Sequence, residues 1–173
     1  MSGPDIAFHM SGRTRTRVRL LAGLGVLGLA AGLLRAPAVA WSHLFLVSYY
    51  ALQVGLAAAV FIAIQSVTGA GWGTALRRIP EALTALIPFG GFGVLAALFF
   101  SPELYPWTAD PHLLHGDFKR FWLDRPFFLA RALAYVLAWT LASRALVRVS
   151  RRQDADPSRA YTHNLRARSA GFL

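Results

Sequence analysis

TGAGWGTALRRIPEAL, residues 68–83, separates two long apolar stretches and combines three glycines, a tryptophan, an arginine pair and one glutamate. Two kinds of structure contain such a segment: a phosphate-binding glycine loop, or a turn between two membrane helices. The best-known phosphate-binding loop follows a strand and carries a lysine and a hydroxyl residue at fixed spacing, which this segment lacks. The flanking sequence must therefore decide between the two.

The composition indicates a membrane protein. Of the 173 residues, 55% are hydrophobic and only 15% are charged, and the mean hydropathy is +0.45. Each of four apolar blocks is long enough to cross a hydrocarbon core about 30 Å thick. We therefore predict an all-α integral membrane protein with four transmembrane helices in a bundle. The predicted spans are residues 20–40, 44–67, 79–100 and 126–147.

Polar segments flank and join these blocks. Residues 1–19 form a basic N-terminal segment, residues 20–147 the transmembrane bundle, and residues 148–173 a basic tail. The largest connection, residues 101–125, is rich in proline and aromatic residues. We expect this loop to be ordered, with a short amphipathic helix around Asp117–Leu123.

The distribution of arginine and lysine predicts the orientation. The N-terminal segment, the 68–83 turn and the tail carry four, two and six of these residues, twelve in all, whereas the opposite side carries four. The positive-inside rule then makes both termini cytoplasmic and the 101–125 loop periplasmic. The net charge of +10 lies beside the membrane, which indicates contact with anionic lipids and not with nucleic acid.

The first block permits an alternative interpretation. A basic segment, an apolar core and APAVA before Trp41 are also typical of a secretory signal that is cleaved after Ala40. Three further apolar blocks follow, so we expect residues 20–40 to remain as a span.

Small residues predict where helices pack closely. Gly28 and Gly32 form a GxxxG pair in the first block, a spacing that lets another helix approach. In the third block, Gly90 and Gly91 follow Pro88 closely. These residues predict a kink or a close helix contact in the middle of the span.

Three charged residues lie within or near the ends of the spans. Glu81 enters the third span about one turn from the cytoplasmic side, and Arg144 lies about one turn before the cytoplasmic end of the fourth. We expect an ion pair or a shared polar network between them, with proton handling by Glu81 as the alternative. Arg131 lies at the opposite end of the fourth span and is expected to pin the 101–125 loop. Its candidate partners are Glu103, Asp124 and loop carbonyls.

An aromatic cluster opens the second span. Trp41, His43, Tyr49 and Tyr50 are suited to the interfacial belt of a membrane protein. The alternative is contact with a quinone or a lipid, because an aromatic cleft with a few hydrogen-bonding groups is sufficient for such a ligand.

No residue pattern indicates catalysis or metal binding. The chain has no cysteine, which excludes thiolate metal sites, iron–sulfur clusters and covalently attached haem. His112 and His115 have a spacing that could hold a metal on one helical turn, but no further ligands accompany them. The middle thirds of the four blocks contain no Asp, Glu, His or Lys. A small transporter or channel is therefore disfavoured, since a proton path needs such groups.

Beyond the 68–83 turn, three further stretches carry a family resemblance. They are AWSHLFLVSYYALQVGLAAAVFIAIQSVTGAGW (40–72), LYPWTADPHLLHGDFKRFWLDRPFFLARALAYVLAW (104–139) and NLRARSAGFL (164–173). Residues 35–173 resemble the ActF-type membrane subunits of bacterial alternative complex III, which are related to the polysulfide reductase membrane subunits. Those subunits continue with further spans, so this chain corresponds to their first four-helix bundle.

The resemblance implies a subunit without a redox cofactor of its own. We expect a non-catalytic accessory or structural subunit of a quinol-linked electron-transfer complex in the bacterial inner membrane, either alternative complex III or a photosynthetic reaction-centre assembly. The implied partners are other integral membrane subunits, a periplasmic cytochrome and anionic lipids. Lipid, quinone or pigment could bind at the surface. The alternative is a proton- or quinol-handling subunit of alternative complex III.

Overall fold

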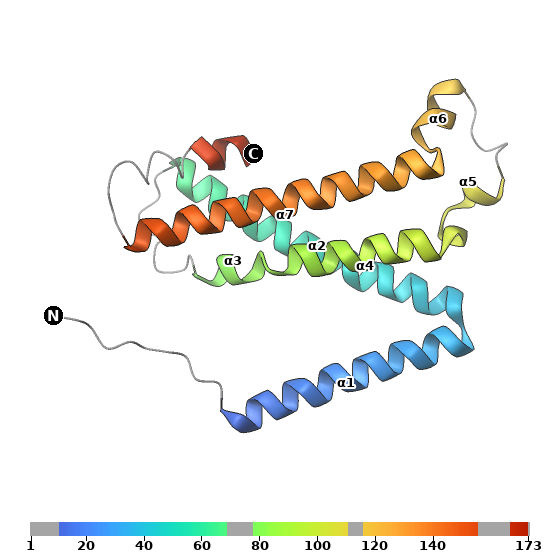
Figure 1. The fold of residues 1–173 in the computed structure, drawn as a ribbon, viewed down its shortest axis with the longest axis horizontal. Helices are drawn as coiled ribbons and strands as arrows, with labels where there is room; N and C mark the ends of the chain where they lie inside the picture. Colours follow the sequence, from blue (N-terminus) through green and yellow to red (C-terminus); the bar gives the residue numbers. More distant parts are fainter. Residues whose placement is uncertain (1–10, 69–77, 111–115, 156–166, 173) are drawn as a thin grey trace. The chain divides into compact units, whose positions relative to one another are not determined.

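The computed structural model describes residues 11–68, 78–110, 116–155 and 167–172 (Figure 1). In these ranges every regular element is a helix. Four helical segments are long and apolar enough to cross a membrane, and the prediction of an all-helical chain with four potential spans is confirmed. They run over Gly12–Arg35, Pro37–Thr68, Arg78–Phe100 and Arg125–Arg151.

The chain divides into two compact units, residues 1–40 and 41–173. In the first unit, helix α1 (Gly12–Arg35) begins eight residues before the predicted start of the first span at residue 20. The Ser11 side chain caps the helix by accepting a hydrogen bond from the Thr14 amide. This cap satisfies a free backbone donor, and arginine is a good helix former, so the basic segment continues the helix.

The boundary between the first two spans differs from the predicted one. Helix α1 ends at Arg35 and is followed by its cap residue Ala36, with φ −149° and ψ 71°. Helix α2 (Pro37–Thr68) begins at the next residue. The residue before a proline is disfavoured in the α conformation, whereas proline is well tolerated at the first helical position. The break between the two helices therefore lies at Ala36 and Pro37, before the predicted span limits at residues 40 and 44, and most of APAVA belongs to the second helix.

The third span is interrupted at the position that Pro88 dictates. Helix α3 (Arg78–Leu83) and helix α4 (Leu86–Phe100) are separated by Thr84 and Ala85. Pro88 has no amide hydrogen to donate to the Thr84 carbonyl four residues earlier. That carbonyl accepts a hydrogen bond from the Ile87 amide at 3.1 Å instead. The kink expected at Pro88 is thus present one turn before it.

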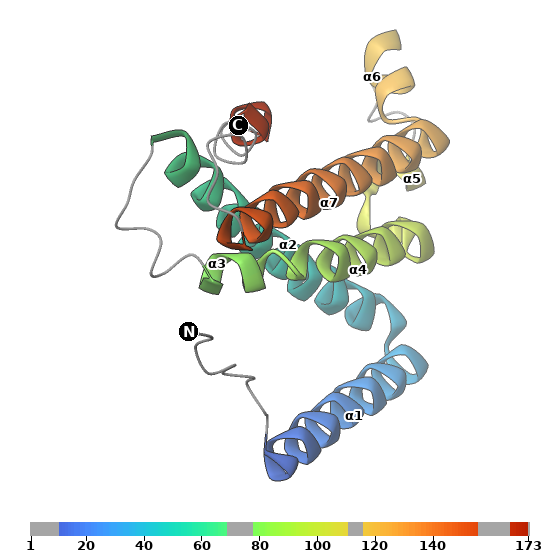
Figure 2. The same ribbon diagram turned by 60° about the vertical axis from the view of Figure 1, so that its left-hand side comes forward.

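In the second unit, α4 packs against both α2 and helix α7 (Arg125–Ala155), as Figures 1 and 2 show. Gly90 faces α2 so closely that a Cβ there would lie 2.6 Å from the Leu52 nitrogen. Gly91 faces α7, where a Cβ would clash with Val136. The two helices that flank α4 also meet, because Ile62 of α2 packs with Leu146 and Val149 of α7.

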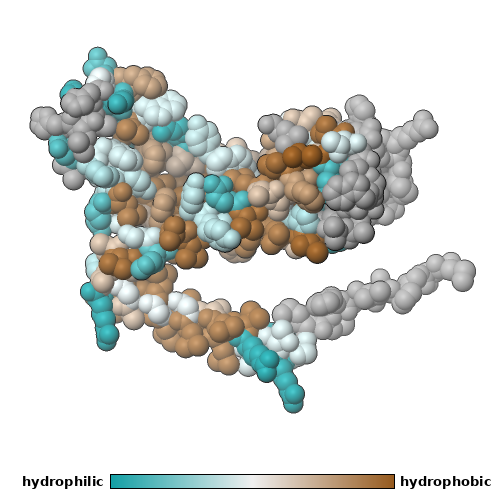
Figure 3. Space-filling view, turned by 180° about the vertical axis from the view of Figure 1, so that it is seen from behind, coloured by the Kyte–Doolittle hydropathy of each residue, from teal (hydrophilic) through white to brown (hydrophobic). Residues whose placement is uncertain are grey.

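Large apolar side chains cover the outer faces of these helices. Figure 3 shows apolar residues over much of the helix surface, as expected for a chain whose surroundings are lipid or other helices. Phe89, Phe92, Tyr50 and Leu141 are each more than 60% exposed.

The described end of the tail lies on this core. Residues 167–172 are helical, and Phe172 packs against the cluster formed by Leu52, Ala59 and Ile87. Ser169 in the same segment is fully buried. Part of the basic tail therefore belongs to the packed unit.

Candidate functional site

Glu81 is the centre of a polar network that joins α3 to α7. Its side chain is only 2% exposed, and one carboxylate oxygen accepts a hydrogen bond from the Ser150 hydroxyl of α7. The other oxygen lies 3.2 Å from Nη1 of Arg78. The Thr84 hydroxyl donates to the Glu81 carbonyl at 2.7 Å, at the break between α3 and α4. A buried carboxylate needs such partners, because an unpaired charge away from water is costly.

The expected ion pair between Glu81 and Arg144 is not formed among the described residues, where Arg78 provides the positive partner. The reason is local: Arg78 and Glu81 are three residues apart on one helix and face each other. Glu81 and Arg144 nevertheless line the same groove, which has a volume of about 850 Å³ and lies between α3, α4 and α7. Its remaining lining residues are Thr84, Ala85, Pro88, Phe89, Phe92, Ser143, Val147, Arg148 and Arg151.

Arg131 contacts the loop at the other end of α7. Its Nη1 donates to the Trp122 carbonyl at 3.2 Å, and its guanidinium lies 3.8 Å from the centre of the Trp122 ring. Arg131 thus contacts a loop carbonyl and an aromatic ring. Neither Glu103 nor Asp124, the predicted acidic partners, forms an ion pair with Arg131 among the described residues. Trp122 belongs to helix α6 (Asp117–Trp122), which matches the predicted amphipathic helix. Cation–π contact and hydrogen bond together fix α6 against α7.

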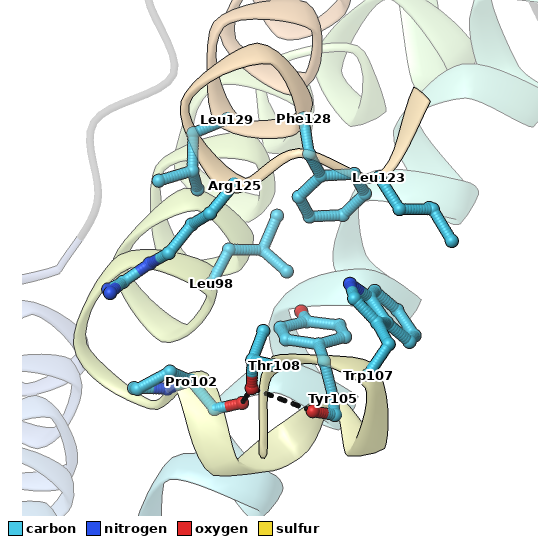
Figure 4. A pocket seen from close by; sticks show the side chains of 9 residues that line it. All are labelled: Leu98, Pro102, Tyr105, Trp107, Thr108, Leu123, Arg125, Phe128 and Leu129. Atoms are coloured by element: carbon cyan, nitrogen blue, oxygen red, sulfur yellow. Dashed lines mark hydrogen bonds between the residues drawn. The ribbon is translucent and has the colours of Figure 1, made fainter. Parts of the chain in front are cut away.

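The first part of the loop is ordered by short helices. A 3-10 turn (η2, Pro102–Leu104) and helix α5 (Pro106–Ala109) follow α4. The Thr108 hydroxyl donates to the carbonyls of Pro102 and Tyr105 at 2.7 and 2.8 Å, as drawn in Figure 4. Arg125 donates to the Phe99 carbonyl at 3.0 Å, which ties the end of the loop to the end of α4.

Tyr105 lies at the centre of an aromatic cluster in this loop. Its ring packs with Trp107 and Phe128, with ring centres 4.8 and 5.7 Å away (Figure 4). Its hydroxyl is buried without a hydrogen-bond partner, and burial raises the pKa of the phenol above its ordinary value of 10.0. The cavity beside it has a volume of about 10 Å³, enough for roughly one water molecule and too small for a cofactor.

The four residues of the predicted aromatic cluster do not converge. On a helix that turns about 100° per residue, Trp41 and Tyr49 lie on one side of α2 and His43 and Tyr50 on the other. Trp41 stacks on Phe100 of α4 with ring centres 5.5 Å apart, and the Tyr49 hydroxyl accepts a hydrogen bond from Gln53. His43 and Tyr50 are exposed. Among the described residues, the four side chains therefore do not face one common pocket.

The glycines expected at helix contacts differ in what they touch. Gly90 and Gly91 face α2 and α7 as described above. Gly32, near the end of α1, lies at the junction with α2, where a Cβ would come within 3.3 Å of the Ala40 Cβ. Gly28 lies one turn earlier on the same helix.

The described residues contain no group of three or more histidines, cysteines and acids that could hold a metal ion. His112 and His115 lie outside the described residues, as does Arg77 of the 68–83 turn.

Two contributions to the site were not predicted from the sequence. Ser150, the buried partner of Glu81, lies beyond the predicted end of the fourth span at residue 147. Arg148 and Arg151 were assigned only as orienting charges of the tail, although they line the groove with Arg144. Arg148 lies four residues after Arg144, and Arg151 three residues after Arg148, and this helical spacing was the signal that places all three on one face.

No family description, curated protein or solved structure matches this chain. The fold class and the geometry of the site are therefore the basis for a functional proposal, together with the resemblance described above.

Proposed function

We propose that this chain is a non-catalytic accessory subunit of a bacterial quinol-linked electron-transfer complex in the inner membrane, cytoplasmic or photosynthetic. The observation that carries the proposal is the close packing of α2, α4 and α7 through Gly90 and Gly91, combined with large apolar side chains on the outer faces. Small residues let the backbones meet, so the unit holds its shape, and its apolar exterior suits lipid and neighbouring helices.

The choice of host rests on the resemblance to ActF-type subunits. It supports alternative complex III or a photosynthetic reaction-centre assembly, with both termini of this chain in the cytoplasm. In that orientation the loop held by Arg131 and Arg125 faces the periplasm, where a cytochrome would meet it. Other integral membrane subunits would contact the apolar faces. The chain would bind no redox cofactor by itself, and lipid, quinone or pigment would lie at its surface.

Native electrophoresis of mildly solubilised membranes tests the accessory role. A chain of 18.9 kDa that belongs to a larger complex must migrate in a much larger band, together with quinol-oxidising or light-absorbing components. Migration of the chain as a separate small species under the mildest conditions would contradict the proposal.

A second candidate function, proton or quinol handling, is favoured by the buried Glu81 and its bond to Ser150. Substitution Glu81→Gln keeps the shape of the side chain and removes its charge. Loss of quinol oxidation in a fully assembled complex would favour proton handling, whereas unchanged turnover would favour the accessory role. The matched control is Glu103→Gln, because Glu103 also bonds a serine, Ser101, but lies exposed in the loop.

A small transporter or channel remains the disfavoured alternative, because the middle thirds of the apolar blocks lack acids, histidine and lysine. Flux of protons or ions into liposomes that contain only this chain would reverse that judgement.

A further inference from the structure

The groove between α3, α4 and α7 combines a cationic side with an apolar side. Arg144, Arg148 and Arg151 line it from α7, and Phe89 and Phe92 line it from α4. The two phenylalanines are 76% and 74% exposed, and the three arginines are exposed as well. A cationic surface on α7 and an apolar surface on α4 therefore line the same groove.

The three arginines concentrate positive charge in one part of the groove. Positions 144, 148 and 151 are four and three residues apart, which places them on one face of α7 within two helical turns. In the part of the chain that the structure describes, none of the three is engaged in an ion pair. Glu81 is the one carboxylate among the lining residues, and it is bonded to Ser150 and Arg78. The groove therefore presents an excess of positive charge.

The cationic and apolar sides of the groove lie at different depths along the spans. The span of α7 ends at Arg151, and the span that contains α3 and α4 begins at Arg78, so the arginines lie near this end of both spans. Phe89 and Phe92 lie about three to four turns from Arg78, further into their span. The cationic side thus lies toward the membrane surface and the apolar side toward the hydrocarbon.

We propose that this groove binds an anionic phospholipid, with the phosphate against Arg144, Arg148 and Arg151 and the acyl chains along Phe89 and Phe92. Basic pockets between membrane helices are suited to anionic headgroups, and arginine forms strong charge-assisted bonds to phosphate. A volume of about 850 Å³ lies in the range of ligand sites, roughly 300–1,000 Å³. A soluble anion would leave the phenylalanines exposed, and a neutral quinone would leave the arginines without a counter-charge.

Native mass spectrometry of the full-length, delipidated chain in neutral detergent tests this site. The probes are phosphatidylglycerol and phosphatidylcholine with identical acyl chains, which differ in net charge. We expect at least tenfold tighter binding of phosphatidylglycerol. Each arginine near a lipid surface contributes about fivefold in affinity, so the triple variant Arg144→Gln, Arg148→Gln, Arg151→Gln should bind phosphatidylglycerol about a hundredfold more weakly.

The matched control removes the same charge elsewhere. The triple variant Arg13→Gln, Arg15→Gln, Arg17→Gln changes α1 and should keep the affinity for phosphatidylglycerol. If the groove variant loses its helical circular dichroism, the single variant Arg148→Gln serves in its place, with an expected loss of about fivefold. Equal losses in the groove and control variants, or equal binding of the two lipids, would overturn the proposal.

The apolar side needs its own test. Phe89→Ala combined with Phe92→Ala should weaken binding of long-chain phosphatidylglycerol several-fold, and should remove most of the gain in affinity with acyl length. Complete displacement of the lipid by millimolar inorganic phosphate would identify a phosphate site in its place. A quinone or a partner helix in the groove of the natively extracted protein would likewise refute the lipid assignment.

Discussion

Substitution Gly90→Ala tests the contact on which the packing of the three helices depends. The added Cβ would lie 2.6 Å from the Leu52 nitrogen and 2.7 Å from the Ser48 carbonyl oxygen, where ordinary contact begins at 3.4 Å. The shortfall is about 0.8 Å, and because both neighbours are backbone atoms, whole helices must separate. Overpacking of this kind costs about 1–3 kcal/mol, and the better helix propensity of alanine offsets up to about 1 kcal/mol. We expect the free energy of unfolding to fall by about 1–2 kcal/mol.

Equilibrium unfolding in mixed micelles with increasing sodium dodecyl sulfate, followed by far-ultraviolet circular dichroism, measures this change. Gly12→Ala is the control, because no described atom lies within 4 Å of its added Cβ; its stability should not fall. Gly91→Ala clashes with a side chain, Val136, so Val136→Ala should relieve that clash, whereas no side-chain truncation at Leu52 can relieve Gly90→Ala. A Gly90→Ala variant as stable as the unaltered chain would refute the close approach of α2 and α4.

Three further predictions concern the loop and the orientation. Arg131→Gln removes the contact with the Trp122 ring and should cost about 0.5–2 kcal/mol, seen as faster amide exchange in residues 117–122 but not in α4. Tyr105→Phe removes a buried hydroxyl that lacks a partner, so thermal stability should stay equal or rise. Because burial raises the pKa of Tyr105, ionisation of the phenol is less favourable in the folded state than in the unfolded state. The free energy of unfolding should therefore fall as pH rises above about 10 through the folded-state pKa, and this alkaline loss should be smaller in the variant. A lower thermal stability of the Tyr105→Phe variant at neutral pH would contradict this prediction. The chain lacks cysteine, so Ser11→Cys and Asp117→Cys can be labelled singly in intact cells; labelling of Asp117→Cys alone is expected, and labelling of Ser11→Cys would reverse the topology.

The sequence predicted the elements better than their contacts. Long apolar blocks are sufficient to predict spans, because the membrane demands length and internal hydrogen bonding. The break before Pro37 was predictable as well, because the residue before a proline is disfavoured in the α conformation. The kink before Pro88 was predictable because the missing amide hydrogen has a local effect.

The partner of Glu81 on α7 could not be predicted from the sequence. Depth in the membrane suggested Arg144, yet the choice between Arg144 and Ser150 depends on the rotation and axial register of α7 against α3. Side-chain packing at contacts such as Gly91 with Val136 sets that register. The role of Arg78 was accessible, since it is three residues before Glu81 on the same helix. The groove between α3, α4 and α7 could not be predicted for the same reason, because the rotation and axial register of α7 also determine which residues line it.

Affinity capture of this chain from gently extracted native membranes, with identification of the co-purifying proteins and an absorption spectrum, tests whether the chain is a subunit of an electron-transfer complex. We expect integral membrane subunits together with either a multihaem cytochrome and an iron–sulfur protein, or bacteriochlorophyll and reaction-centre polypeptides. The first set would identify alternative complex III as the host, and the second a photosynthetic assembly. Recovery of the chain without any electron-transfer component would contradict the account.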